Sequence, residues 1–486
     1  MTRPGKIIEA EQRSRVQQAD GTLAGRLGQL SLGHQLIALA IWPLLEQILS
    51  FMVNTVDIIL ATRMADGDTR IAVMDALGLG GYVMWLMMIL QGAVATGVLA
   101  IISRAAGARK PEEARQGLVQ GILAGLFMGL LSGIIIRLGL TKLITEFDLS
   151  EDASSFAFDY LSVLVWSCPL LGIFYACTYA LRGVGDTRTP FVIMVMINLC
   201  NVGLSAAFVY LDPPIGGLGI AGLAWGSLLA WLLGTIIAVS VLYRQSKPGS
   251  DEITLTLRRA KWTPQREMMM RIGRVGLPQG AEMLGMWLIH FYVLNFITGL
   301  SFDGALGAHI IAIRIESLSF LPGFAIGTAA ATLIGQYLGA KNPAMALKAL
   351  RTAWFFGLLF MTTIGISFLL APEAIVRLIL PASDPQANRL IATAAPLVFI
   401  CGIFQPALAT TIIMKTSLRG AGATRTVMVW SFSCLILFRV VGITLYDQFA
   451  DLTLISIWAF MSIDLFVQAI LFVFISFRGK WLEAKV

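Results

Sequence analysis

The chain has 486 residues, of which 57% are apolar and only 13% are charged, and its formal net charge is +7. Its mean hydropathy is +0.78, whereas soluble proteins carry about 25% charged residues. This composition excludes a soluble globular protein. Nucleic-acid binding is also excluded as a function, because the basic residues are not gathered on a soluble domain.

Twelve apolar runs along the chain are long enough to cross a bilayer core of about 30 Å. Ahead of them, residues 1–34 are polar and mixed in charge, and we expect them to form a cytoplasmic tail. The spans are predicted near residues 36–62, 77–103, 116–138, 156–181, 190–211, 218–243, 272–300, 305–336, 346–370, 389–414, 426–446 and 453–477. The sequence therefore predicts an all-α integral membrane protein.

The placement of charge predicts the orientation of these spans. Most of the 36 Lys and Arg residues fall in segments on one side of the membrane if both termini are cytoplasmic. The positive-inside rule then favours this orientation. We expect the protein in the plasma (inner) membrane, in contact with membrane lipids, and as a monomer.

Three landmarks occur twice, at nearly the same offset. LRGVGDTRTP (181–190) and LRGAGATRTV (418–427) are identical at seven of ten positions. AAGARKP (105–111) is echoed by YLGAKNP (337–343), and a proline in span one is echoed by a proline in span seven. The chain therefore contains two copies of a six-helix repeat.

An even number of spans in each unit gives both copies the same orientation, related by a pseudo-two-fold axis along the membrane normal. The predicted organisation is therefore two pseudo-symmetric six-helix lobes joined on the cytoplasmic side. After the tail, its parts are an N-lobe at 35–243, a cytoplasmic linker at 244–271, a C-lobe at 272–477 and a C-terminal tail at 478–486.

The repeated LRG stretches have the composition of a turn between two helices. Gly183 and Gly185 permit the conformations that end a helix. We expect Arg182 and Arg188 to lie at the cytoplasmic headgroups. A cytoplasmic elbow explains most of this pattern, and a role in coupling conformational changes is the alternative.

Span one carries four polar residues on one helical face. Glu46, Ser50, Asn54 and Asp57 are spaced by four, four and three positions. An ionisable group at membrane depth costs about 2.5–3.5 kcal/mol, so such a stripe indicates a water-filled cavity or polar partner helices. Asp57 is the acid nearest the outer side.

Spans five and six repeat this pattern with amides and hydroxyls. Asn198, Asn201 and Ser205 share a face of span five, and span six adds Ser227. Together with the carboxylate of span one, these groups can supply oxygen ligands to Na⁺. Alternatively, the carboxyl group alone can carry a proton in a dry pocket. The alternative without a role in ion binding is a buried acid whose hydrogen bonds are satisfied by neighbouring groups.

The second half is not equivalent to the first. Aligned on the prolines, Asp57 corresponds to Tyr292, and Glu282 corresponds to Gln47. Polar and adaptable groups on spans one, seven and eight are candidates for a substrate cavity, with a polar bridge to another helix as the alternative. These candidates are Glu46, Glu282, Met286, His290, Tyr292 and Glu316.

Two further ionisable residues are expected to pair within the C-lobe. Arg439 and Asp464 lie at similar distances from the cytoplasmic ends of spans eleven and twelve, hence at one depth. Each can neutralise the other, so we interpret them as a structural ion pair. His290 and His309 are more readily explained as hydrogen-bonded packing residues than as proton carriers.

Motifs for catalysis are missing from the sequence. It has no GxxxxGK[ST] loop and no GxSxG elbow, and its three histidines and five cysteines form no metal-binding pattern. The sequence therefore predicts a protein that is not an enzyme, with no cofactor and no metal site. Energy for transport would come from an ion gradient.

The LRGVGDTRTP stretch followed by an Asn-bearing helix resembles the multidrug and toxic compound extrusion (MATE) family. NTVDIIL (54–60), the segment GAHIIAIRIESLSFLPGFAIGTAAATLIGQYLGAKNP (307–343) and FRGKW (477–481) are similar to bacterial members too. The resemblance covers roughly residues 33–481.

This resemblance implies a cation site in the N-lobe, with Asp57 as its acid, Asn201 as its amide and Ser227 as its hydroxyl. Ser205 departs from the family pattern, because many relatives carry a carboxylate there. The departure favours H⁺ over Na⁺ as the coupling ion.

The function expected from these features is secondary active efflux of amphipathic, cationic organic compounds by antiport with H⁺ or Na⁺. The two lobes would open alternately to either side. One alternative is a flippase for lipids or lipid-linked oligosaccharides of the same superfamily. Another, from a different class, is a membrane-embedded enzyme or sensor.

Overall fold

The computed structural model describes most of the chain, and everything below concerns the described residues. They are residues 23, 25–64, 66–147, 149–244, 255–258, 260–300, 304–380 and 385–484. Within these ranges, the side chains of residues 26, 53–55, 68, 385 and 386 are not described.

The described chain is helical throughout, without a strand. The first half contains α2 (Gly25–Gly28), α3 (Leu32–Thr62), α4 (Gly67–Gly107), α5 (Pro111–Glu146), α6 (Glu151–Leu164), the 3₁₀ turn η1 (Val165–Ser167), α7 (Cys168–Gly183), α8 (Arg188–Tyr210) and α9 (Gly219–Arg244). The second half contains α10 (Arg266–Thr298), α11 (Ala305–Gly339), α12 (Pro343–Leu370), α13 (Pro372–Arg377), α14 (Pro385–Gly420), α15 (Thr424–Cys434), the π-helical segment η2 (Leu435–Gly442), α16 (Ile443–Phe449), α17 (Leu454–Arg478) and the 3₁₀ turn η3 (Lys480–Glu483).

Twelve of these helical segments are long and apolar enough to cross a membrane. The helices α6 and α7 form one such segment around η1, and α15 and α16 form another around η2. The predicted all-α fold with twelve spans is therefore confirmed. Several helices extend beyond the apolar runs; α5, for example, begins at Pro111, which is favoured at a first helical position.

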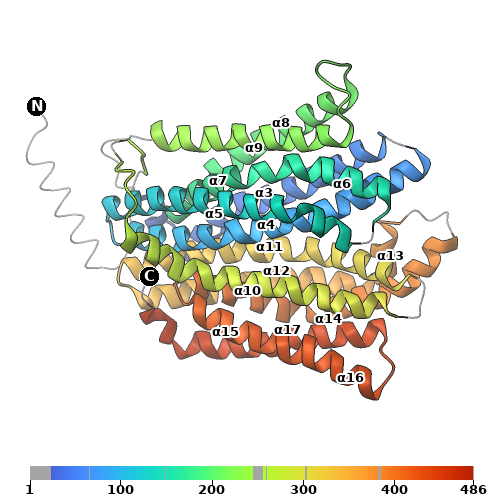
Figure 1. Ribbon diagram of the computed structural model, residues 1–486. Coiled ribbons are helices and arrows are strands. Elements are labelled where there is room, and N and C mark those ends of the chain that lie inside the picture. Colours follow the sequence, from blue (N-terminus) through green and yellow to red (C-terminus); the bar gives the residue numbers. More distant parts are fainter. Residues whose placement is uncertain are drawn as a thin grey trace, which may run out of the picture.

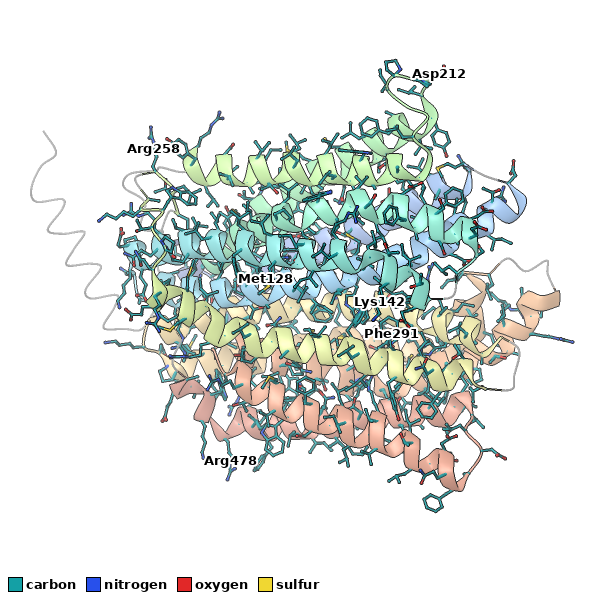
Figure 2. The ribbon with its side chains drawn as sticks, in the orientation of Figure 1. Met128, Lys142, Asp212, Arg258, Phe291 and Arg478 are labelled. Atoms are coloured by element: carbon teal, nitrogen blue, oxygen red, sulfur yellow. The ribbon has the colours of Figure 1, made fainter. Side chains whose placement is uncertain are left out.

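The long helices lie side by side in a single bundle, with the two halves of the sequence above and below one another (Figure 1). Arg258 and Arg478 lie at one end of the bundle, and Asp212 lies at the other (Figure 2). We call the first the basic end; it also contains the turns at 108–110, 184–187, 340–342 and 421–423.

The repeated turns adopt the backbone conformation that their glycines predict. Gly185 and Gly422, at equivalent places in the two LRG stretches, have φ angles of 96° and 89°. This is the left-handed region, which a side chain would strain. Both turns therefore end a membrane helix and redirect the chain at the basic end.

Each LRG turn is hydrogen-bonded by the other half of the molecule. Gln336 on α11 donates through Nε2 to the carbonyl oxygen of Gly183 at 3.0 Å. Arg104 on α4 donates through Nη2 to the carbonyl oxygen of Ala421 at 2.9 Å. Arg104 and Gln336 immediately precede the repeated AAGARKP and YLGAKNP segments. The residue before this segment in each half therefore hydrogen-bonds the LRG turn of the other half.

Close backbone approach also joins the two halves, where α4 packs on α10 and α11. A methyl group added at Gly97 would meet the backbone of Ile272, and one at Gly276 would overlap the carbonyl oxygen of Ala93. Small residues at such a crossing let membrane helices touch.

We predict that Gly97→Ala lowers thermal stability while Gly92→Ala does not. Both glycines lie inside α4, and both changes gain about 1 kcal/mol of helix propensity. A methyl group at Gly92 has open space around it, but at Gly97 it must push α10 away, at a cost of about 1–3 kcal/mol. Thermal unfolding of the two purified variants in detergent measures the difference. Equal midpoints would show that the crossing is loose.

The predicted lobe boundaries remain a prediction, and the names N-lobe and C-lobe are used here for α3–α9 and α10–α17. The helix α10 begins at Arg266, inside the predicted linker. Two linker residues, Leu255 and Leu257, are buried in a core formed by N-lobe helices together with Met268 and Ile272 of α10. Three predicted segments lie partly outside the described residues: the N-terminal tail at 1–22 and 24, the linker at 245–254 and 259, and the C-terminal tail at 485–486.

Candidate functional site

The register of α3 against α8 is fixed by contacts near both ends. Toward the basic end, the rings of Trp42 and Phe191 are 5.3 Å apart. Toward the other end, the hydroxyl of Tyr210 donates to the carbonyl oxygen of Leu60 at 2.6 Å. The two helices therefore run in the same direction and stay in contact along most of their length.

This register places Asp57 at the depth of the polar residues of α8. Asp57 lies one turn before Leu60, so it is level with the α8 turn that holds Ser205. Tyr160, on α6, lies within electrostatic range of the carboxylate. The side chain of Asn54 lies outside the described residues, so its predicted part in this face stays a prediction.

The polar residues of α8 are buried against α9. Asn201 is 6% exposed and Ser205 is fully buried, and Asn198 lies one turn closer to the basic end. Asn201 donates through Nδ2 to the hydroxyl of Ser227 on α9 at 2.9 Å. Ser205 lies against Gly226, where any side chain would overlap it. The structure thus brings Asn201 and Ser227 together, and their part in an ion site stays a prediction.

Several polar atoms of this group, which we call the N-lobe cluster, have no hydrogen-bond partner among the described residues. They are Oδ1 of Asp57, Nδ2 of Asn198, Oδ1 of Asn201 and Oγ of Ser205. An unsatisfied buried polar group costs about 1–3 kcal/mol, so a cluster of them requires an explanation. Three of the four atoms are oxygens, and they can accept a proton donor or coordinate a hard cation.

The described residues contain no group of three or more His, Cys, Asp or Glu side chains that could hold a metal ion. The N-lobe cluster has a single carboxylate, with amide and hydroxyl groups around it. A protein site for a divalent ion such as Ca²⁺ usually draws on several carboxylates, which this cluster does not provide.

The C-lobe has a different arrangement at the position equivalent to Asp57. The hydroxyl of Tyr292 lies 2.5 Å from Oγ1 of Thr444 on α16, so the phenol is hydrogen-bonded. Tyr292 also packs edge-on against Phe296. The structure therefore gives Tyr292 a local partner, and the two lobes differ chemically at this depth.

Glu46 was a candidate for the substrate cavity, and the structure corrects that interpretation. Nη2 of Arg182 donates to both carboxylate oxygens of Glu46, at 2.8 and 2.7 Å. Arg182 is only 7% exposed and stacks over the ring of Tyr179, so it does not lie at the headgroups as predicted. The carboxylate forms an ion pair with the first LRG stretch, so it is not free to attract a substrate cation.

Glu282 is corrected in the same way, because it binds the second LRG stretch. Its Oε2 lies 2.8 Å from Nη2 of Arg419, and its Oε1 lies 2.7 Å from Nζ of Lys415. Glu282 is 1% exposed. In structural role it corresponds to Glu46 and not to Gln47, because positions three and four after the proline share a helix face.

The buried charges of the C-lobe continue as a chain of contacts from α14 to η2. Nζ of Lys415 lies 3.4 Å from Oε1 of Gln468 on α17, whose Nε2 donates to Oδ1 of Asp464 at 2.7 Å. The predicted pairing of Arg439 with Asp464 is present, with Nε donating to Oδ2 at 2.7 Å. Arg439 lies in η2, and π-helical segments are frequent at functional sites.

The remaining candidates lie near the α4–α10 contact and on α11. His290 and His309 stack at 6.1 Å, and His309 accepts a hydrogen bond from Trp458 at 3.1 Å. The ring of Trp85 on α4 contacts His290 edge-on at 6.0 Å. These contacts match the packing interpretation of both histidines.

Glu316 lies within electrostatic range of Arg439 and is partly buried. Met286, on α10, is also partly buried. Glu316 has no ion-pair partner among the described residues, and the place of both residues in a substrate cavity stays a prediction.

Sequence reasoning missed four residues that shape these sites: Tyr160, Phe291, Lys415 and Arg419. Phe291 contacts Tyr82 on α4 at 5.1 Å and Phe147 at 6.1 Å, and it helps to join the lobes. The signal for Arg419 was present, since the repeated LRG stretch places an arginine at the same position in both halves.

Together, twelve helices long enough to cross a membrane, two pseudo-symmetric halves and a buried polar cluster indicate a membrane transporter. The sequence matches the MatE family profile over residues 19–207 and 278–445, and the chain belongs to this family of transporters, which are not enzymes.

Similar proteins agree with this assignment. A protein of Thermotoga maritima named "Probable multidrug resistance protein NorM" is 29% identical over 420 residues, covering 85% of this chain and 86% of its own. "Uncharacterized transporter YisQ" of Bacillus subtilis is 21% identical over 382 residues, covering 78% and 80%.

Solved structures share the fold. A transporter of the MOP superfamily from Pyrococcus furiosus superimposes with a TM-score of 0.84 at 19% identity, covering 95% of this chain and 98% of its own. A MATE family transporter in an outward-facing conformation gives a TM-score of 0.84 at 20% identity with the same coverage.

Proposed function

We propose that this protein exports amphipathic, cationic organic compounds by antiport with protons, and that the proton binds at Asp57. The observation that carries the proposal is the unpaired carboxylate oxygen of Asp57 within the N-lobe cluster. The names of relatives such as the Thermotoga maritima protein support multidrug export as the activity.

In the proposed cycle, the protein lies in the plasma membrane with its basic end in the cytoplasm, as the placement of Lys and Arg suggests. Substrate enters between the lobes from this side. A proton that binds from the outside removes the charge of Asp57 and changes the balance of interactions between α3 and α8. That change favours release of substrate outward, and the return step carries the proton inward.

The site suits a proton better than Na⁺. Asp57 is the only carboxylate of the N-lobe cluster, and Ser205 provides a neutral hydroxyl where a second carboxylate would strengthen binding of Na⁺. The membrane potential contributes about 2.3 kcal/mol per charge per 100 mV, and the concentration gradient of the ion adds to it.

The flippase alternative is disfavoured by the charges of the C-lobe. A pyrophosphate-linked substrate requires free cations in the cavity. Lys415 and Arg419 are both held by Glu282, and Arg439 is held by Asp464. Each of these three cations of the described C-lobe core is therefore engaged by a carboxylate of the protein and is not free to bind a phosphate.

Reconstitution in liposomes tests the proposal. A pH gradient and a Na⁺ gradient are imposed separately at fixed membrane potential, and the movement of a fluorescent organic cation is followed. We expect the pH gradient to drive substrate against its own gradient. If only the Na⁺ gradient drives transport, Na⁺ and not the proton is the coupling ion. If neither gradient drives transport, the proposal is contradicted.

A further inference from the structure

A groove of about 900 Å³ lies at the basic end, between the first half of α10 and the start of α15. Most of its wall is apolar. The complete lining is Pro264, Arg266, Met269, Met270, Gly273, Arg274, Leu277, Pro278, Ala281, Arg425 and Met428. None of these residues belongs to the N-lobe cluster or to the buried ion pairs.

The lining of α10 forms one continuous stripe. Arg266, Met270, Arg274, Leu277 and Ala281 follow one another at spacings of four, four, three and four, so they share a helix face. All five are exposed. The stripe is about 22 Å long at 1.5 Å per residue, and it runs from the basic end toward the middle of the bundle.

Three arginines surround the part of this groove that lies toward the basic end. Arg266 and Arg274 come from α10, and Arg425 comes from the first turn of α15. Among the described residues, none of the three has a carboxylate partner within ion-pair distance. The first turn of α15 also has no side-chain cap, so its backbone N–H groups add to the positive potential.

The equivalent place in the N-lobe is filled by aromatic side chains. Trp42 on α3 and Phe191 on α8 pack with ring centroids 5.3 Å apart. The guanidinium of Arg188 lies over the tryptophan ring at 5.7 Å. The junction of α3 and α8 is thus closed by its own residues, and its arginine is engaged.

The C-lobe has smaller or more flexible residues at the same positions. Counted from the prolines inside the two helices, Leu277 takes the place of the tryptophan. Counted from the LRG stretches, Met428 takes the place of the phenylalanine, and Arg425 that of the arginine. The groove exists because these substitutions remove the aromatic filling and leave an arginine without a ring to cover.

We propose that this groove binds an anionic phospholipid of the membrane leaflet at the basic end. The three arginines hold the phosphate headgroup, and one acyl chain lies along Met270, Leu277 and Met428. Basic pockets between membrane helices on the cytoplasmic side are suited to anionic headgroups. The charge of the rim excludes the cationic substrates of the proposed efflux activity, so the groove is not their entrance.

The proposal depends on the proposed orientation, with the basic end in the cytoplasm, and not on the ion or substrate of transport. Its experiment therefore measures lipid binding and not transport. Purified protein in nanodiscs of phosphatidylcholine is compared with protein in nanodiscs that also contain phosphatidylglycerol. Native mass spectrometry counts the phosphatidylglycerol molecules retained, and titration gives their affinity.

We expect the wild-type protein to retain phosphatidylglycerol specifically. Each of Arg266→Gln, Arg274→Gln and Arg425→Gln should weaken binding about fivefold. Arg188→Gln, at the filled N-lobe junction, is the matched control and should bind as the wild type does. The double variant Leu277→Trp, Met428→Phe copies the N-lobe filling and should lose the bound lipid while keeping all three arginines.

Three results would overturn the proposal. The first is unchanged phosphatidylglycerol binding in the triple arginine variant, provided that its thermal unfolding in phosphatidylcholine matches the wild type. The second is that inorganic phosphate, added without the anionic lipid, stabilises the protein against thermal unfolding as much as phosphatidylglycerol does. This would make the groove a site for free anions. The third is a dimer that dissociates in the filled double variant, which would make the groove an interface between two copies of the chain.

Discussion

Asp57→Asn is expected to abolish proton-driven transport while leaving the protein folded. Asparagine has nearly the same shape, and it can still accept and donate hydrogen bonds within the N-lobe cluster. It cannot gain or lose a charge, so proton binding no longer changes the interactions between α3 and α8. A coupling free energy of about 1–3 kcal/mol is lost, which corresponds to a factor of about 5 to 150 in gradient-driven accumulation.

The measurement is accumulation of a fluorescent organic cation in liposomes under an imposed pH gradient. Tyr292→Phe is the matched control, because Tyr292 is the C-lobe counterpart of Asp57 by sequence alignment. It loses only its contact with Thr444 and should keep the dependence on pH. If the Asp57→Asn protein still accumulates substrate at the wild-type rate under this gradient, the proton is bound elsewhere.

Glu282→Gln is expected to destabilise the protein more than any other single change among the buried ion pairs. Glutamine leaves Lys415 and Arg419 without their counter-charge, 11% and 7% exposed at the side chain. Breaking a buried pair by removal of one partner costs about 3–5 kcal/mol. Here two cations are stranded at once, and they also repel each other.

Glu46→Gln provides the matched comparison in the N-lobe, because it strands only Arg182. Its midpoint of thermal unfolding in detergent should therefore lie above that of Glu282→Gln. A double variant, Glu282→Gln with Lys415→Met, should recover part of the loss, since one unpaired charge is removed. Equal effects of Glu46→Gln and Glu282→Gln would mean that Lys415 is neutralised by other groups.

The sequence predicted the fold because each membrane helix has a strong local signal. Apolar length, the clustering of Lys and Arg, and the repeated LRG stretches are all properties of short segments. The polar face of α8 was predictable for the same reason, since its residues share a face by spacing alone, and the spacing on α3 likewise indicated a polar stripe. Their mutual packing follows from the fold.

The partners of Glu46 and Glu282 were not predictable in the same way. A polar stripe on a helix indicates a cavity or a polar neighbour, and the spacing of the stripe does not distinguish the two. Arg182 lies far from Glu46 in sequence, and an arginine beside a glycine turn suggests a headgroup contact. Only the ion pairs from α3 to α7 and from α10 to α14 show that the arginines turn inward.

The crosswise hydrogen bonds from Arg104 and Gln336 have a consequence for the proposed cycle. Each lobe supplies the donor that closes the other lobe's turn, so neither lobe can rotate away from the basic end while one of these bonds persists. Both bonds must therefore break before the lobes can separate at that end in the proposed cycle. Opening of the proposed cycle at the basic end therefore breaks at least two hydrogen bonds, one to each LRG turn.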